Sequence, residues 1–283
     1  MSSSRVWRVP CLRYKLTDIR LSKPGQVQGY EWTTRWKDNV VANISKWASE
    51  EDKMINITQG YMTVPLRVRV RKFLPQPGDK LSRTWTANGQ TRSVDIPPYA
   101  IVDLQSVESA YMDVIEPGIL ECLESVTEEE GGLLRETYLR AWMFAQDPGT
   151  SLEDRGLMLQ TFRLWVAVRM ATRSDVIVGP ETLGMPQDIM DETSPLRGKI
   201  PLPPVMGAQL DLILSQNLIP KLRKSLLTQL QRMSQANQVR NWLVMYLVFF
   251  ILLNNTALLF CHDEVYAKKH GMNVGVVLAC LTS

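Results

Sequence analysis

The chain has 283 residues, of which 45% are hydrophobic and 22% are charged. This balance is typical of a folded globular protein and excludes a wholly disordered chain, which has few apolar residues and a high net charge. The net charge is only +3, but residues 1–100 hold 17 basic and 8 acidic side chains, whereas residues 101–200 hold 8 and 18. The basic first third permits contacts with phosphates, although solvated surface arginines explain it as well.

Residues 1–53 are predicted to form an irregular, linker-like segment with one short helix near residues 39–47. Residues 54–99 are predicted to form a small antiparallel β module. From Leu66 to Arg71 apolar residues alternate with arginines, which predicts a strand with one buried face. Asn88 and Gly89 both accept the positive φ of a type I′ turn, so a hairpin is expected around them. The strand and the hairpin together predict a three-stranded sheet.

Residues 100–272 are predicted to form an all-helical domain, which makes the chain mainly α with a small antiparallel β-sheet. The expected helices cover residues 101–126, 133–145, 151–173, 206–231 and 235–268. Pro117-Gly118 predicts a kink or break in the first helix, and Ser151 with Asp154 predicts a capped start of the third. Residues 175–204 contain six prolines and predict a long connection with one turn of helix.

The stretch from Trp242 to Cys261 carries no charged residue and is long enough to cross a bilayer, which needs about 20 apolar residues. The stretch includes Asn254 and Asn255, whose amides are costly in hydrocarbon unless they are hydrogen-bonded. Neighbouring helices of a bundle can supply those bonds. We therefore expect a buried core helix, and the alternative is a membrane-anchored protein with a single span near residues 242–261.

Metal and catalytic sites are not predicted. The four cysteines are Cys11, Cys122, Cys261 and Cys280, and none lies within six residues of another. Zinc ligands usually occur in closely spaced pairs, so the chain offers no zinc site. There is no glycine-rich phosphate loop or nucleophile elbow. The sequence thus predicts no enzyme, no cofactor and, without a secretory segment, a reducing intracellular compartment.

Several ordered strings between residues 10 and 272 carry a resemblance to one family. They include Cys11-Leu12-Arg13-Tyr14-Lys15-Leu16-Thr17-Asp18, Gly29-Tyr30-Glu31-Trp32-Thr33, Ile96-Pro97-Pro98-Tyr99-Ala100, Glu181-Thr182-Leu183-Gly184-Met185, Asp191-Glu192-Thr193-Ser194-Pro195 and Pro203-Pro204-Val205-Met206-Gly207. On these strings the chain resembles the region that follows the DNA-binding cluster in fungal zinc binuclear cluster transcription factors. Cys11 resembles the last of the six cysteines that such a cluster needs, and the other five have no counterpart in this chain.

The resemblance implies a non-catalytic regulatory or interaction region of a nuclear transcription factor, with the transcription machinery as a source of protein partners. Zinc is expected only for a full-length form. We interpret the chain as a shortened product or gene model, in which residues 1–53 follow a lost zinc cluster and residues 273–283 form an atypical tail. Weak contacts with DNA phosphates are expected from Arg8, Arg13, Lys15, Arg20 and Lys23. A membrane partner and a membrane location belong only to the alternative interpretation.

Overall fold

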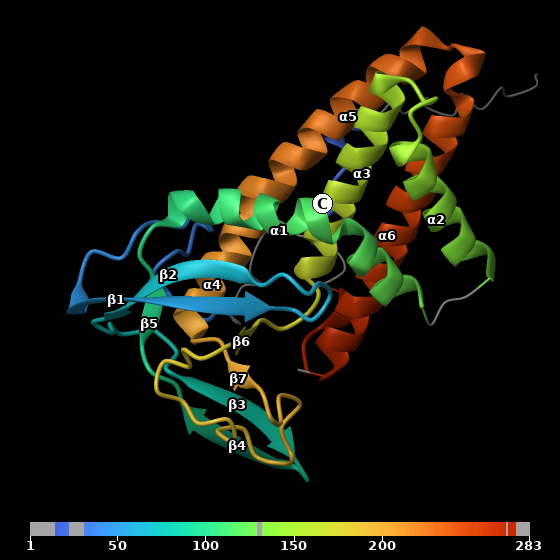
Figure 1. The fold of residues 1–283 in the computed structure, drawn as a ribbon. Coiled ribbons are helices and arrows are strands. Elements are labelled where there is room, and N and C mark those ends of the chain that lie inside the picture. Colours follow the sequence, from blue (N-terminus) through green and yellow to red (C-terminus); the bar gives the residue numbers. More distant parts are fainter. Residues whose placement is uncertain (1–14, 23–30, 129–131, 270, 276–283) are drawn as a thin grey trace, which may run out of the picture.

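The computed structural model describes residues 15–22, 31–128, 132–269 and 271–275. Figure 1 shows a sheet at one end of the molecule and long helices that extend away from it, with helix α1 (Leu104–Thr127) across the junction. The architecture is mainly helical with a small antiparallel sheet, which confirms the predicted fold class.

The main sheet has five strands in the order β5-β2-β1-β6-β7, and all neighbours in it are antiparallel. The strands are β1 (Trp47–Thr58), β2 (Leu66–Phe73), β5 (Tyr99–Ile101), β6 (Val176–Val178) and β7 (Ile200–Pro201). In β2 the side chains of Leu66, Val68 and Val70 are buried and those of Arg67 and Arg69 are exposed, which confirms the predicted alternation.

Strands β3 (Ser82–Ala87) and β4 (Gln90–Asp95) form a hairpin with its own two-stranded sheet. Asn88 and Gly89 have φ values of 51° and 73°, as the predicted type I′ turn requires. The expectation that this hairpin would complete a three-stranded sheet with β2 is wrong. Its place beside β2 is taken by β1 and β5, and residues from the ranges 1–53, 54–99 and 100–272 all contribute to the main sheet.

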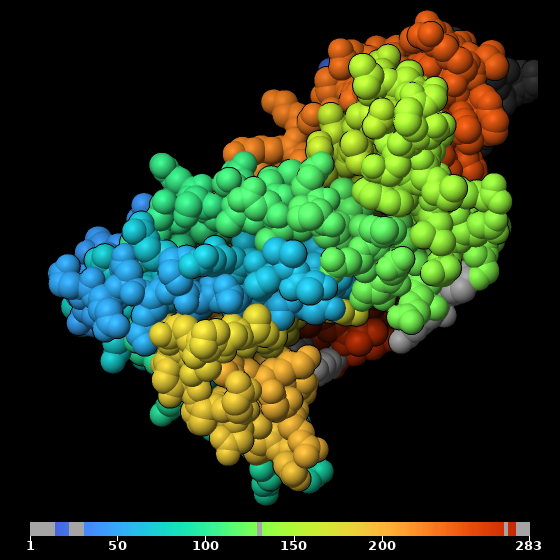
Figure 2. All heavy atoms as spheres, viewed as in Figure 1, coloured from blue at the N-terminus to red at the C-terminus, as the bar shows by residue number. Residues whose placement is uncertain are grey.

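The hairpin is held by the long connection between β6 and β7. The Trp85 indole nitrogen donates to the Thr193 hydroxyl over 2.9 Å, and Arg92 pairs with Asp191 over 2.7 Å. In Figure 2 this connection, coloured yellow to gold, covers much of the region that the hairpin occupies in Figure 1. The connection is long and rich in turns, as predicted, but it begins and ends in strands that no sequence pattern indicated.

The short helix predicted near residues 39–47 is absent from this described part of the chain. Asn39 has a φ of 61°, which ends the preceding turn in a left-handed conformation, and the chain then has no regular secondary structure until β1 begins at Trp47. The Arg71 guanidinium lies over the indole of Trp47, and its central carbon is 5.4 Å from the ring centroid. Pairing of β1 with β2 therefore overrides the weak helical signal of these residues.

Helix α1 continues through Pro117, so of the predicted kink or break, the break does not occur and the kink stays a prediction. A Cβ atom on Gly118 would lie 2.3 Å from the Met62 sulfur, which shows that the glycine allows Met62 to pack directly on the helix backbone. Helices α2 (Gly132–Gln146) and α3 (Leu152–Met170) follow. The predicted cap of α3 is confirmed, because the Ser151 hydroxyl accepts a hydrogen bond from the Asp154 backbone N–H over 3.1 Å.

The remaining helices are α4 (Pro204–Leu212), α5 (Ile219–Ala236) and α6 (Trp242–Lys269). A π-helical segment, Ile213–Leu218, joins α4 to α5. It lies just before Pro220, which has no N–H to donate to the preceding turn, and this accounts for the altered winding. Asn237, with a φ of 46°, ends α5, and a single 3₁₀ turn leads into α6.

Helix α3 is the centre of the helical part and contacts α1, α2, α5 and α6. Its Phe162 and Trp165 side chains are fully buried, as is Tyr138 of α2. The Tyr138 and Trp165 ring centroids are 5.4 Å apart, and those of Phe162 and Trp165 are 6.5 Å apart. Burial of one such side chain contributes about 1.5–3 kcal/mol, so this aromatic group is a main source of stability for the helical layer.

Candidate functional site

The predicted phosphate-contacting residues are only partly within the described part of the chain. Arg8, Arg13 and Lys23 lie outside the described residues. Lys15 and Arg20 are exposed on either side of a single 3₁₀ turn, Leu16–Asp18, which contacts α5. The two positive charges are therefore available to a ligand at the surface, but their positions do not indicate a specific ligand.

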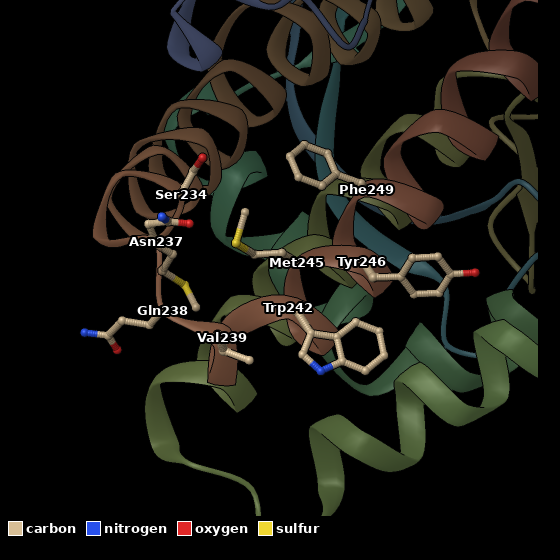
Figure 3. Close-up of a pocket in the computed structure, with 9 residues that line it drawn as sticks. Ser234, Asn237, Gln238, Val239, Trp242, Met245, Tyr246 and Phe249 are labelled. Carbon is tan, nitrogen blue, oxygen red and sulfur yellow. The ribbon is translucent and has the colours of Figure 1, made fainter.

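A hollow with a largely apolar lining lies at the corner where α5 turns into α6 (Figure 3). Its volume is about 470 Å³. The lining residues are Met233, Ser234, Asn237, Gln238, Val239, Trp242, Met245, Tyr246 and Phe249. The left-handed Asn237 and the 3₁₀ turn bring the end of α5 and the start of α6 to opposite sides of this hollow.

The chemistry of the corner pocket suits binding. Val239 and Trp242 at its rim are 85% and 63% exposed, so a large apolar surface is open to a partner. The lining has indole, phenol, hydroxyl and amide groups but no carboxylate, imidazole or thiol. Such a surface can accept an apolar side chain or a ring and orient it with a few hydrogen bonds. It contains no pair of groups for general acid–base catalysis.

A second, polar cluster lies where the hairpin meets the main sheet and the helices. The Gln59 amide donates to Asp175 over 2.5 Å. Burial and then the nearby Asp211 carboxylate raise the pKa of Asp175 to about 7, although the hydrogen bond from Gln59 and the charge of Arg83 act in the opposite direction. Asp175 therefore changes its charge near neutral pH, which an ordinary aspartate does not do.

Arg83 of the hairpin is the cationic member of this polar cluster. Its guanidinium donates from Nε and Nη2 to the Leu202 carbonyl, over 3.2 and 2.9 Å, and lies 3.9 Å from the centroid of the Trp32 ring. Burial lowers the Arg83 pKa to about 10, although Asp211 and Asp175 favour its charge. Sequence reasoning missed this cluster because its members are far apart in the chain and form no motif.

A buried arginine attaches α6 to the centre of the helical part. Arg169 of α3 is buried, and its Nη2 donates to the Asn255 carbonyl over 3.2 Å. The Tyr138 hydroxyl donates to the side-chain oxygen of Asn254 over 2.8 Å. The Tyr138 bond confirms that the side chain of Asn254 bonds to a neighbouring helix of the bundle. Arg169 instead bonds to the main-chain carbonyl of Asn255, whose side-chain oxygen is buried without a hydrogen-bond partner. The arrangement holds α6 in place and is a structural feature of the core.

The segment Val239–Lys268, which includes α6, is the one helix in the described part of the chain that is long and apolar enough to cross a membrane. Only 39% of its most apolar stretch is buried. The expected burial of α6 is therefore correct for the face of this helix that packs on α3 and α2, and wrong for its opposite face. Length and composition do not favour a membrane span over a helix of a folded domain, because both satisfy the same criterion.

Metal ligands were not predicted in this chain. Within the described ranges, no group of three or more His, Cys, Asp or Glu side chains is arranged to hold a metal ion. Cys122 is buried, and burial raises its pKa to about 12, so its thiol stays protonated. Neither the corner pocket nor the polar cluster holds a nucleophile that a neighbouring base could activate.

The comparisons with known proteins agree with the resemblance seen in the sequence. A family model described as the KpeA transcription factor matches residues 23–277. The Satratoxin biosynthesis SC3 cluster transcription factor SAT20 of Stachybotrys chartarum is 21% identical over 280 residues, which cover 93% of this chain and 36% of SAT20. The chain thus spans about a third of the length of that relative. No solved structure matches the chain. Because the family model covers most of the residues, the chain belongs to the KpeA transcription factor family.

Proposed function

We propose that this chain is the non-catalytic regulatory and interaction region of a fungal zinc-cluster transcription factor, and that it acts in the nucleus. The observation that supports this proposal is the match of the transcription factor family model to residues 23–277. The region contributes to transcription control through contacts with other proteins. The corner pocket between α5 and α6 is the surface best suited to such contacts, because it is apolar, open and lined by large side chains.

In this proposal, sequence-specific DNA recognition belongs to the zinc cluster of a full-length factor. The chain itself contributes weak contacts with phosphates through Lys15 and Arg20, together with Arg8, Arg13 and Lys23. Phosphate contacts position a protein on DNA but carry no sequence information. Binding of DNA by the purified 283-residue chain should therefore be weak, dependent on salt and indifferent to sequence.

A reporter assay tests the regulatory role. The chain is fused to an unrelated DNA-binding domain, and the expression of a reporter with the matching site is compared with that given by the DNA-binding domain alone. We expect a several-fold change in expression in either direction. The variant Trp242→Ala tests the corner pocket, because it removes a large exposed side chain from the rim and leaves the core intact. Leu152→Ala, at an 84% exposed position of α3 outside the pocket, is the matched control.

Two results would contradict the proposal. A nuclear fusion that leaves the reporter unchanged would show that the chain has no regulatory activity. A sequence-specific gel shift by the chain alone would show that DNA recognition does not need a zinc cluster. If the reporter responds but Trp242→Ala and Leu152→Ala behave alike, the regulatory role stands and the corner pocket is not its binding surface.

A further inference from the structure

Helix α5 presents a stripe of basic and polar side chains on its outer face. The helix, Ile219–Ala236, contains basic residues but no acidic one. Between Asp211 and Asp263 the chain carries five basic residues and no acidic residue. Residues at intervals of three and four lie on the same face of a helix. The exposed residues that form this outer stripe are Lys221, Lys224, Ser225, Thr228, Arg232 and Gln235.

The composition of the outer stripe indicates the kind of partner that it fits. The apolar side chains of α5, among them Leu226, Leu230 and Met233, are buried in the core. A helix that binds a lipid surface places apolar side chains in the lipid, and the centre of a protein interface is rich in aromatic residues and poor in lysine. The outer stripe has no large apolar residue. Its lysine, arginine, hydroxyl and amide groups are those that bind phosphates of nucleic acids.

Most of the charge in the stripe is not neutralised by the described part of the chain. Lys221 pairs with Glu108 over 2.6 Å, which offsets its charge. Lys224 and Arg232 have no ion pair with any described residue. The chain between them rises by about 12 Å along the axis of α5, at about 1.5 Å per residue. These two residues therefore carry the charge that a ligand can use.

The positive charge of α5 continues into the amino-terminal segment. The 3₁₀ turn Leu16–Asp18 contacts α5, and Lys15 and Arg20 on either side of it are exposed. Asp18 is the one acidic residue of the described segment 15–22. The flanking segments 1–14 and 23–30 contain four basic residues and no acidic one, so their charge has the same sign as that of the stripe.

The parts of the chain outside the described ranges offer little charge that could neutralise the stripe. Glu129 and Glu130 are their only acidic residues. Both belong to the connection between α1 and α2, which lies outside α5 and the turn beside it. The partner that complements the stripe is therefore a polyanion supplied by another molecule in the assay described below.

We propose that the outer stripe of α5 binds the phosphate backbone of double-stranded DNA beside Lys15 and Arg20, with Lys224 and Arg232 as its charged contacts. This rests on the proposed function, in which Lys15 and Arg20 contact DNA phosphates, and adds a second element to that contact. Each DNA strand has a phosphate about every 3.4 Å along the axis, so the distance from Lys224 to Arg232 spans about three or four phosphates. Such contacts position the chain on DNA without reading its sequence.

Fluorescence anisotropy with a short labelled DNA duplex of arbitrary sequence tests the proposal on the whole 283-residue chain. The double variant Lys224→Gln, Arg232→Gln should weaken binding at low salt by about tenfold or more, because each lost phosphate contact removes one counterion release. The slope of log K against log salt should become shallower by about 1.8. Both positions are exposed, so the fold should be kept, which circular dichroism and thermal unfolding check.

A matched control removes two positive charges from another part of the surface. Arg67 of β2 and Lys199, next to β7, are exposed and lie outside the stripe. The double variant Arg67→Gln, Lys199→Gln should leave the slope unchanged. The conservative double variant Lys224→Arg, Arg232→Lys should bind like the wild type, since a phosphate contact needs the positive charge at each position. Lys224→Glu, Arg232→Glu should bind more weakly than the glutamine variant.

Two results of these titrations would overturn the proposal. One is a slope that the glutamine variant of Lys224 and Arg232 leaves unchanged, and the other is an equal loss in the Arg67 and Lys199 control. If Lys15→Ala, Arg20→Ala lowers the slope and the α5 variant does not, the proposed phosphate contacts stand and the role of α5 alone fails. The reporter fusion has its own DNA-binding domain, so its result does not depend on α5.

An acidic protein and an anionic membrane are the other partners that positive charge could attract. Polyglutamate serves as a competitor of the labelled duplex, and vesicles of phosphatidylcholine with a fifth of phosphatidylserine serve as the probe in a flotation assay. We expect unlabelled DNA to compete far better than polyglutamate at equal charge, and the chain to stay unbound by the vesicles. Equal competition, or flotation that Lys224→Gln, Arg232→Gln abolishes, would assign the stripe to an acidic protein or to lipid and overturn the proposal.

Discussion

Replacement of Asp175 by asparagine should stabilise the protein at pH 8 and have a smaller stabilising effect at pH 5. Burial and the neighbouring Asp211 raise the Asp175 pKa from 3.8 to about 7. Asparagine has the shape of the protonated acid, and its side-chain oxygen can still accept the bond from Gln59. The variant therefore removes a charge that is unfavourable in the folded state and keeps the hydrogen bond.

The sign of the effect follows from the order of the two pKa values. Between the ordinary value of 3.8 and about 7, the folded chain binds a proton at Asp175 that the unfolded chain has already released. The contribution of this group to stability is therefore greatest at low pH and falls as the pH rises through that window. The full displacement of the pKa corresponds to about 4 kcal/mol at about 1.4 kcal/mol per pH unit. Asp175 keeps some contact with water, so we expect about 1–2 kcal/mol.

Urea unfolding at pH 5 and pH 8 measures this effect as the difference between variant and wild type. Comparison with the wild type at each pH cancels the titration of all other groups. Asp175→Asn should be more stable than the wild type by about 1–2 kcal/mol at pH 8, and the difference should shrink towards pH 5. A variant that is less stable at pH 8, or a difference that does not depend on pH, would refute the assignment of a raised pKa.

Asp79 provides a control in which the same chemical change has the opposite sign. Burial raises the pKa of Asp79, but hydrogen bonds from Arg35, the Gln76 backbone and Thr33 outweigh it and hold the pKa below its ordinary value. Arg35 pairs with the fully buried Asp79 carboxylate over 2.7 Å. The stabilising contribution of the Asp79 carboxylate is present above the ordinary aspartate pKa. It is lost as the pH falls from that value through the lowered pKa of Asp79 in the folded chain. Asp79→Asn should therefore destabilise the chain at pH 8 by about 3 kcal/mol.

Three further predictions concern packing, capping and charge. Gly118→Ala should destabilise the chain by about 1–3 kcal/mol because the new Cβ atom would meet Met62. In urea unfolding, the double variant Gly118→Ala, Met62→Ala should lose less stability than the sum of the losses in the two single variants. Ser151→Ala removes the cap of α3 and should lower the free energy of unfolding by about 1 kcal/mol; an unchanged value would show that the cap contributes nothing. The double variant Lys15→Ala, Arg20→Ala should weaken DNA binding equally for all sequences and reduce its salt dependence, as measured by fluorescence anisotropy.

Local features of this fold could be predicted because they depend on neighbouring residues. The alternation of β2 fixes which side chains of the strand share a face. The Asn88-Gly89 pair accepts a positive φ, which most residues avoid, so these two residues are enough to predict the turn between β3 and β4. The Ser151 cap likewise needs only the three residues that follow it. The strings that indicated the family are also local, so they can be recognised without knowledge of the fold.

Features that depend on distant partners could not be predicted. β6 and β7 have only three and two residues, too few to show a periodicity. They become strands because β1 offers an edge to β6, and β6 offers the next edge to β7. The helix expected near residues 39–47 was wrong because β1 begins at Trp47 and pairs with β2. The packing of Met62 on Gly118 of α1 joins residues that lie 56 positions apart in the chain. The polar cluster of Gln59, Asp175 and Arg83 exists only once the hairpin and the sheet are assembled.

Helix α6 separates the two kinds of information most clearly. The sequence by itself determined that residues 242–261 carry no charge, and it predicted a helix through them. Its composition is apolar on every side, so the sequence could not indicate which side faces the protein. The tertiary structure decided this through Tyr138, which bonds to the Asn254 side chain, and through Arg169, which bonds to the main-chain carbonyl of Asn255, while the inner face packs on α3 and α2. The opposite face remains uncovered because buried polar groups must keep their partners, whereas an apolar side chain packs equally well on any apolar surface.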